Sequence, residues 1–289
     1  MSMPQDYDIS VIIVSYNCLD SLKACIESLE GQQRVRLEMV VIDNDSSDGT
    51  APFLEKRSLK HILSQKNLGF GAAVNRAAER AEGKFLFILN PDTIVPPLTL
   101  FKLLEYAGQD PQAGIVAPLL LRPDGRQQLS ARRMPRRRDI MLGRGSPLHL
   151  FGLVAEDAAG YIINSGDDPM EVPAVSAGAI LIEAALFRKL GGFDERFFLY
   201  MEDLDLCKRI SRVNKKTVIL PSVSVIHVWR QSSRQRPYFS SYHHHLSVYK
   251  YFVKHYPTQL PHNLLLLIAL IAGLSITFVL NLLRPRGQE

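Results

Sequence analysis

The stretch that decides the fold is FLFILNPDTIVPP, residues 85–97. Its opening residues are apolar without interruption, which is typical of a strand that is buried on both faces of a sheet. The run then ends in Asn90-Pro91-Asp92, so a single carboxylate stands at the tip of the strand, just before a turn. A buried strand that delivers one acid to its end predicts a functional site at that end.

Two earlier runs follow the same plan. The segment DISVIIVSYN (8–17) is apolar and ends in polar residues, and LEMVVIDNDSSDGT (37–50) breaks into an acidic turn. Between the strands, residues 21–32 and 67–83 carry apolar side chains at helical spacing. Strands that alternate with helices predict an α/β fold, with a mostly parallel central sheet and helices on both faces. Residues 110–175 show a less regular pattern.

The polar residues at the strand ends should meet at one edge of this sheet, because ligands of open parallel sheets bind beyond the carboxyl ends of the strands. The residues concerned are Ser15, Asn17, Asp43, Asn44, Asn90 and Asp92. The sequence at these ends contains neither GxGxxG nor GxxxxGK[ST], the two common phosphate-binding loops. We therefore expect a ligand site at this edge that is not built on either loop.

Composition is compatible with one large domain, or one domain with an appendage, since the chain has 289 residues and 46% of them are hydrophobic. The net charge of +5 permits contact with nucleic acid, anionic lipid or phosphorylated substrates, and does not choose among them. The three cysteines, Cys18, Cys25 and Cys207, have no metal-ligand spacing, which predicts reduced thiols in a cytoplasmic fold. The first ten residues lack a basic segment followed by an apolar run, so no signal peptide is expected.

The C-terminal region has a different character, because residues 264–283 (LLLLIALIAGLSITFVLNLL) contain no charged side chain. A helix of this length spans roughly 30 Å, the thickness of the hydrocarbon layer of a bilayer. Arg284 and Arg286 follow it directly. These features predict a helix that crosses the membrane or lies in it; the alternative is a buried core helix. The predicted organisation is an α/β domain over 1–235, an amphipathic membrane-proximal segment over 236–262, a transmembrane or membrane-embedded helix over 263–284 and a tail over 285–289.

Two basic clusters allow more than one interpretation. The segment ARRMPRRRD (131–139) holds five arginines, which form either a solvated loop or a contact with diphosphate or anionic lipid. The triplet His243-His244-His245 cannot chelate one metal, because successive residues of a helix face different directions.

An acidic motif, YMEDLDLCKRI (200–210), follows an aromatic stretch. A carboxylate held beside aromatic rings can have a raised pKa, which suits a general base. The alternative is an exposed helix start, where acids are favoured by the helix dipole. Adjacent residues of a helix point apart, so Glu202 and Asp203 should have different roles. The residues of this segment alone leave both interpretations open.

Five segments together resemble family 2 glycosyltransferases, the inverting nucleotide-sugar enzymes with the GT-A fold, and most closely their rhamnosyltransferase-like branch. The segments are SVIIVSYN, VVIDNDSSDGT, NLGFGAAVNRA, FLFILNPDT and GGFDERFFLYMEDLDLCKR. The resemblance extends from about residue 8 to about residue 230, with the motifs in the family's order. It implies a Rossmann-like GT-A domain that transfers a sugar, with L-rhamnose as one candidate, from a dTDP- or UDP-sugar to a saccharide or lipid-linked acceptor. The product would enter cell-envelope or exopolysaccharide synthesis.

The resemblance also implies roles for individual residues. Asp92 is the expected ligand of a divalent cation, Mg²⁺ or Mn²⁺, that bridges the donor's diphosphate, and His227 completes the metal shell in some members. Asp203 matches the catalytic base, and Glu202 is expected to position the acceptor. Asp43 matches an aspartate that accepts a hydrogen bond from N3–H of uracil or thymine. The residues expected to bind the nucleotide-sugar are Ser15, Tyr16, Asn17, Asp43, Asn67, Gly69 and Asn90.

The chain departs from the family pattern at two places. Arg230 stands where many members have glycine after the histidine, and AVSAGAILI lacks the tryptophan that often precedes Gly-Ala. These departures leave the closing loop and the acceptor contacts open.

Other functions remain as alternatives at this level. One is a UDP-hexose or UDP-N-acetylhexosamine transferase of the same fold. Another is an inactive GT-A domain that binds nucleotide-sugar or scaffolds a membrane complex, although the presence of both Asp92 and Asp203 argues against it. Nucleic acid is not an expected partner, and we expect the catalytic domain on the cytoplasmic face of the inner membrane.

Overall fold

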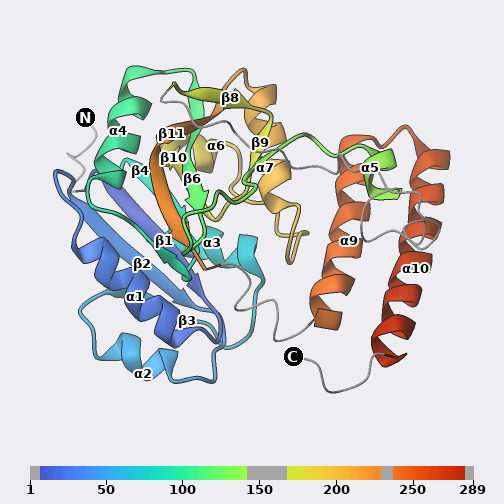
Figure 1. Ribbon diagram of the computed structural model, residues 1–289, viewed down its shortest axis with the longest axis horizontal. Helices are drawn as coiled ribbons and strands as arrows, with labels where there is room; N and C mark the ends of the chain where they lie inside the picture. The colour runs from blue at the N-terminus through green and yellow to red at the C-terminus, as the bar shows by residue number, and fades with distance from the viewer. Residues whose placement is uncertain (1–6, 142–167, 229–236, 284–289) are drawn as a thin grey trace.

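A nine-stranded mixed sheet forms the centre of the molecule, and helices cover both of its faces (Figure 1). The computed structural model describes residues 7–141, 168–228 and 237–283. The sheet has the order β3-β2-β1-β4-β10-β6-β11-β5, with β8 paired to β11, while β7 and β9 form a separate pair. The strands are β1 (Ile9–Ser15), β2 (Leu37–Asp43), β3 (Lys60–Leu63), β4 (Phe85–Leu89), β5 (Thr93–Ile94), β6 (Ala113–Leu121), β7 (Ala131–Arg132), β8 (Met170–Val172), β9 (Ala174–Val175), β10 (Ala179–Glu183) and β11 (Lys216–His227). The helices are α1 (Leu19–Glu30), α2 (Thr50–Glu55), α3 (Phe70–Ala78), α4 (Thr99–Gln109), α5 (Arg137–Met141), α6 (Ala184–Lys189), α7 (Glu202–Arg212), α9 (Pro237–His255) and α10 (Leu260–Leu283).

The parallel part of the sheet is its N-terminal half. Strands β3, β2, β1 and β4 run parallel, with Ser15 paired to Asp43 and Ile13 paired to Leu89. This register brings the polar strand ends to one edge, as predicted. The prediction of a mostly parallel sheet is wrong for the other half, because β10 enters antiparallel between β4 and β6. The five residues of β10 (AILIE) look like those of any buried strand, so their pattern does not encode direction.

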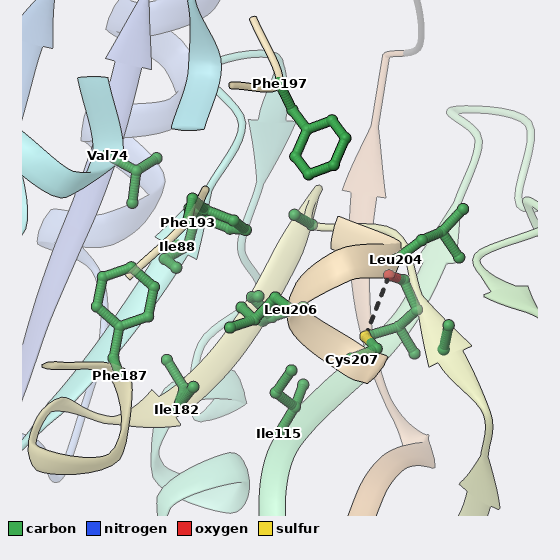
Figure 2. Packing of buried hydrophobic residues seen from close by; sticks show 14 of the residues in the cluster. Val74, Ile88, Ile115, Ile182, Phe187, Phe193, Phe197, Leu204, Leu206 and Cys207 are labelled. Carbon is green, nitrogen blue, oxygen red and sulfur yellow. Dashed lines mark hydrogen bonds between the residues drawn. The ribbon is translucent and has the colours of Figure 1, made fainter. Parts of the chain in front are cut away.

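Two layers of apolar side chains pack on the sheet. Alternate residues of β1 point to opposite faces, so Val11 and Ile13 pack with α1 and α4 while Ile12 and Val14 pack with α3, α6 and α7. Figure 2 shows the second layer, where Leu206 of α7 lies among Ile115 and Ile182 of the sheet and aromatic rings of the segment before α7. This packing holds the start of α7 over the sheet edge.

The segment that was expected to be less regular contains a central strand. β6 (Ala113–Leu121) pairs with both β10 and β11, although it carries Pro118. Proline has no backbone N–H to donate to β11. Opposite Pro118, the register of β11 shifts between Leu220 and Ser224, which accommodates the lack of this donor. Residues 142–167, also within the irregular segment, lie outside the described part of the chain.

The C-terminal helices α9 and α10 pack side by side at one end of the molecule, with α5 against α10 (Figure 1). α9 buries Val248, Tyr251 and Phe252, and α10 buries Leu266 and Leu270, all in the core layer shared with α7. A different set of large apolar side chains on α10 is exposed, namely Leu260, Leu264, Leu265, Ile268, Ile271 and Phe278.

The predicted membrane-crossing helix over 263–284 is not supported. No helix within the described ranges is both long and apolar enough to span a bilayer. Part of the apolar run has a role inside the protein instead, since Leu266 and Leu270 fill the core layer beneath α9.

Candidate active site

A pocket of about 690 Å³ lies at the carboxyl edge of the sheet, in the volume range of small-molecule sites. The pocket is surrounded by the strand tips, the loop before α3, Arg132 of β7, residues 176–178, the start of α7, and α9. Eight of the predicted site residues line it, namely Tyr16, Asn67, Gly69, Asn90, Asp92, Glu202, Asp203 and His227. The other three, Ser15, Asn17 and Asp43, lie in and beside the first two strand ends and are not among the lining residues.

Asp92 and His227 meet at one end of the pocket although they are far apart in sequence. β5 follows Asp92 and pairs antiparallel with β11, so that Thr93 lies opposite His227. His227 Nε2 lies 3.2 Å from Asp92 Oδ1 and 3.2 Å from Asn90 Nδ2. The backbone N–H of Val228 also donates to the carbonyl oxygen of Asp92, at 2.8 Å.

Gln128 determines which nitrogen of His227 carries the proton. Its Nε2 donates to the backbone carbonyl oxygen of His227 at 2.5 Å, and its Oε1 lies 2.8 Å from Nδ1 of the same residue. A carbonyl oxygen only accepts, so the amide nitrogen must face it and Oε1 must face Nδ1. In the neutral imidazole the proton is therefore on Nδ1, and the lone pair of Nε2 points toward Asp92.

This arrangement suits a divalent cation. A lone pair and a carboxylate that face each other at 3.2 Å are both satisfied when a cation lies between them. Asp92 and Nε2 of His227 could contribute ligands. Among the described residues no group of three or more His, Cys, Asp or Glu could hold a metal ion. Substrate oxygens and water would then have to complete the coordination.

Glu202 and Asp203 lie at another part of the pocket, in the first turn of α7. The two residues before them, Tyr200 and Met201, have φ values of 67° and 68°, a left-handed conformation that is costly for large side chains. Such strain at the entry of a helix is common where a side chain must be aimed at a ligand. Oδ1 of Asp203 accepts a hydrogen bond from the N–H of Leu204 at 2.8 Å.

The carboxyl group of Glu202 is buried and has an unusual pKa. Burial raises the pKa of Glu202 to about 8, the negative charge of Asp203 adds to the rise, and Arg132 partly opposes it. Its Oε2 has no hydrogen-bond partner among the described residues. The raised pKa keeps the proton on Glu202 at neutral pH.

The loop before α3 connects the two halves of the site. Asn44 holds it, since its Oδ1 accepts from the N–H of Leu68 and its Nδ2 donates to Asn67 Oδ1. Gly69 has φ +82°, and a Cβ at this position would lie 2.3 Å from the carbonyl oxygen of Phe198. The next N–H, of Phe70, donates to that same oxygen at 3.0 Å. Glycine is therefore required here for backbone contact with the segment that enters α7.

The first two strand ends form a compact loop cluster. The side-chain oxygen of Asn17 accepts from the N–H of Ser47 at 2.8 Å, and Oδ1 of Asp43 accepts from the N–H of Ser46 at 3.2 Å. Asp43 is buried, and this burial raises the pKa of its carboxyl group despite the hydrogen bonds from Ser46.

One wall of the pocket was not predicted from the sequence. Arg132 of β7, Phe198 and Tyr200 before α7, and several residues of α9 line it. The arginine cluster and the histidine triplet were signals for this wall, but neither has a periodicity that places it beside Glu202 and Asp203. Of the triplet, His244 and His245 line the pocket.

Comparisons with known proteins agree with this geometry. Residues 10–159 match the profile described as "Glycosyl transferase family 2". A relative from Mycobacterium tuberculosis, N-acetylglucosaminyl-diphospho-decaprenol L-rhamnosyltransferase, is 31% identical over 254 residues, which cover 83% of this chain and 82% of the relative.

Two solved structures share the fold. A mannosyltransferase from Pyrobaculum calidifontis, in complex with GDP-Man and Mn²⁺, matches with a TM-score of 0.59 and 17% identity over 98% of this chain and 76% of its own. The structure of GalNAc-T7 with UDP, GalNAc and Mn²⁺ matches with a TM-score of 0.60 and 18% identity over 78% of this chain and 44% of its own.

Proposed function

The chain belongs to glycosyl transferase family 2 and is a glycosyltransferase, and from this premise we propose that it transfers L-rhamnose to a lipid-linked N-acetylglucosamine. The observation that carries the proposal is the shared pocket, into which Asp203 faces together with the Asp92–His227 pair. The name of the M. tuberculosis relative supports the choice of sugar and acceptor. The product would be a precursor of a cell-envelope polysaccharide.

We propose that the donor is a dTDP- or UDP-sugar. Asp43 would accept the N3–H of the pyrimidine base, while Tyr16, Asn67 and Gly69 would border the nucleotide. Asp92 and His227 would hold Mg²⁺ or Mn²⁺, which supplies positive charge for the leaving diphosphate. Gln128 supports this binding by keeping the lone pair of His227 Nε2 directed at the site.

The chemistry proposed is a single displacement with inversion. The acceptor hydroxyl attacks the anomeric carbon while its proton passes to the carboxylate of Asp203. The bond from the anomeric carbon to the diphosphate oxygen breaks in the same step, and the nucleoside diphosphate leaves with the electron pair. Protonated Glu202 can donate a hydrogen bond to the acceptor, which fits its expected role in positioning it.

We also propose that the protein works at the cytoplasmic face of the inner membrane. The exposed apolar side chains of α10 would rest in the interfacial layer of the bilayer without crossing it. Sedimentation with anionic phospholipid vesicles tests this. Replacing Leu264, Leu265 and Ile268 with serine should abolish co-sedimentation, while the same exchange at exposed Leu63 and Val213 should not. Equal co-sedimentation of both variants would refute the proposal.

The function itself is tested by transfer from dTDP-rhamnose to GlcNAc-diphosphate on a short alkyl chain, with and without Mn²⁺. Asp203→Asn should lower kcat by about 10²–10⁴-fold and leave donor binding intact. Asp92→Ala should abolish Mn²⁺-dependent donor binding measured by calorimetry. A well-folded protein that binds no nucleotide-sugar would overturn the proposal.

A further inference from the structure

One wall of the pocket belongs to α9, which lies well beyond residues 10–159, the part that matches the family profile. The residues of α9 in this wall are Phe239, Ser240, Ser241, His244 and His245. The ring of His244 contacts the ring of Tyr200 edge-on, with centroids 5.4 Å apart. This places the wall next to the strained entry of α7, and so next to Glu202 and Asp203.

Two buried polar atoms in the lining residues have no hydrogen-bond partner among the described residues. They are Oε2 of Glu202, whose residue is 7% exposed, and Nε of Arg132. An unpaired buried donor or acceptor destabilises the fold by roughly 1–3 kcal/mol, so we expect such atoms to be paired in the working protein. A bound ligand that accepts a hydrogen bond from Arg132 and forms one with Glu202 would pair both atoms.

His244 and Arg132 give this wall one neutral imidazole and one positive charge. Burial lowers the pKa of His244 to about 4, and the nearby charges of His245 and Arg132 act in the same direction. His244 is therefore neutral at pH 7 and offers one donor and one acceptor, which suits sugar hydroxyls. Arg132 brings a permanent positive charge and a planar fork of N–H groups, which suits phosphate oxygens.

The wall is a fixed part of the site, because α9 is fastened to the segment around α7. Ser247 donates to the carbonyl oxygen of Leu199 at 2.9 Å, directly beside Tyr200. Lys250 donates to the carbonyl oxygen of Arg196 at 2.7 Å. Further along α9, Lys254 and His255 both contact the buried carboxylate of Asp205. Helix α9 therefore keeps its position relative to Asp203.

We propose that Arg132 and His244 form the acceptor subsite, with Arg132 binding the diphosphate of the lipid-linked acceptor and His244 binding a hydroxyl of its sugar. This inference rests on the proposed function and adds to it the residues that recognise the acceptor. The donor's diphosphate is assigned to Asp92 and His227, so the two diphosphates have different binding groups. Acceptor recognition thus depends on α9 and β7.

The test measures acceptor binding apart from transfer. GlcNAc-diphosphate on a short alkyl chain is titrated into the protein by calorimetry, as is the same compound without the diphosphate. For Arg132→Gln we expect at least a tenfold rise in Kd for the diphosphate compound, with Kd for the other compound and for dTDP-rhamnose unchanged. For His244→Ala we expect a similar rise in Kd for both acceptor compounds. In transfer assays both variants should raise the acceptor KM more than they lower kcat.

Matched controls are the sequence neighbours Arg133→Gln and His243→Ala, which do not line the pocket and should leave acceptor binding unchanged. Arg132→Lys keeps the charge but loses the planar fork, so an intermediate Kd is expected, and thermal unfolding identifies any variant that has lost its fold. A rise in the Kd of dTDP-rhamnose with unchanged acceptor Kd would overturn the inference. If the wild-type protein binds the acceptor through Arg132 but transfers nothing, the proposed function fails and the subsite remains.

Discussion

Oδ1 of Asp205 in α7 lies 2.8 Å from Nε2 of His255 in α9, and neither side chain is exposed to solvent. The same carboxylate contacts Lys254 at 2.5 Å and Arg209 at 2.8 Å. Asp205 is two residues after Asp203, so α7 is tied to α9 through one buried carboxylate. This tie explains how α9 can form a wall of the pocket.

Replacing Asp205 with asparagine should destabilise the protein by about 3–5 kcal/mol, because it removes the charge of a buried carboxylate that pairs with half-buried Arg209 and with His255, while Lys254 keeps Asp194 as a partner. Urea unfolding measures the change. The matched control is Glu171→Gln, which removes an exposed partner of Lys216 and should cost less than about 1 kcal/mol. Equal effects of the two substitutions would show that Asp205 does not anchor α9.

The stability of this tie should depend on pH in the mildly acidic range. Burial lowers the pKa of His255 from 6.5 by more than its hydrogen bond to Asp205 raises it. The unfolded chain therefore binds a proton before the folded one, so the contribution to stability is complete above pH 6.5 and is lost below it. Compared with His255→Asn, the wild-type protein should lose more unfolding free energy between pH 7 and pH 5. Parallel pH profiles of the two proteins would contradict this, and the lowered pKa of Asp205 affects only more acidic solutions.

Glu202 has the opposite effect on stability. Its carboxyl group has a pKa of about 8 in the folded protein against 4.5 in the unfolded chain, so stability falls as pH rises between these values. Glu202→Gln should remove this loss and raise the unfolding free energy at pH 7 by on the order of 3 kcal/mol, with little gain at pH 4.5. Because glutamine imitates the protonated acid, we expect kcat to fall by less than about tenfold, far less than for Asp203→Asn. A pH-independent difference in stability would show that Glu202 is ionised in the folded protein.

Gly69→Ala should destabilise the protein by about 2 kcal/mol or more and weaken donor binding. The new methyl group would lie 2.3 Å from the carbonyl oxygen of Phe198, at a φ of +82° that L-residues rarely adopt. Thermal unfolding and calorimetry with dTDP-rhamnose measure the two effects. Gly108→Ala in α4 is the control, since nothing lies within 4 Å of the added Cβ and a helical alanine should be neutral or stabilising. An unchanged Gly69→Ala protein would mean that the loop does not need to touch Phe198.

Gln128→Leu should lower the Mn²⁺ affinity of the donor complex by about 10–100-fold, because His227 loses the hydrogen bond that directs its Nε2 lone pair toward Asp92. Titration of Mn²⁺ into the complex with dTDP-rhamnose measures this. The control, Gln112→Leu, alters an exposed glutamine near the start of β6 and should leave the affinity unchanged. Full Mn²⁺ affinity in the Gln128→Leu variant would show that Gln128 does not support metal binding.

Much of the first half of the fold could be predicted from local pattern. Unbroken apolar runs identified β1, β2 and β4, and their polar ends located the site edge that carries Asn90 and Asp92. The strand β6 was missed because Pro118 interrupts its pattern, and the antiparallel direction of β10 has no local signature. Periodicity reports which side chains are buried, and burial is the same for either strand direction.

The sequence by itself determined the alternation of strands and helices, the acid at the tip of β4 and the acidic pair that begins α7, because short-range spacing and residue chemistry suffice for these. Only the tertiary structure decided that Gln128 would orient His227 from 99 residues away, that burial would raise the pKa of Glu202, and that α9 would form a wall of the pocket, held to α7 through Asp205 and His255. Each of these depends on which surfaces pack together, and packing is set by the shape and burial of the whole chain, which no local pattern encodes.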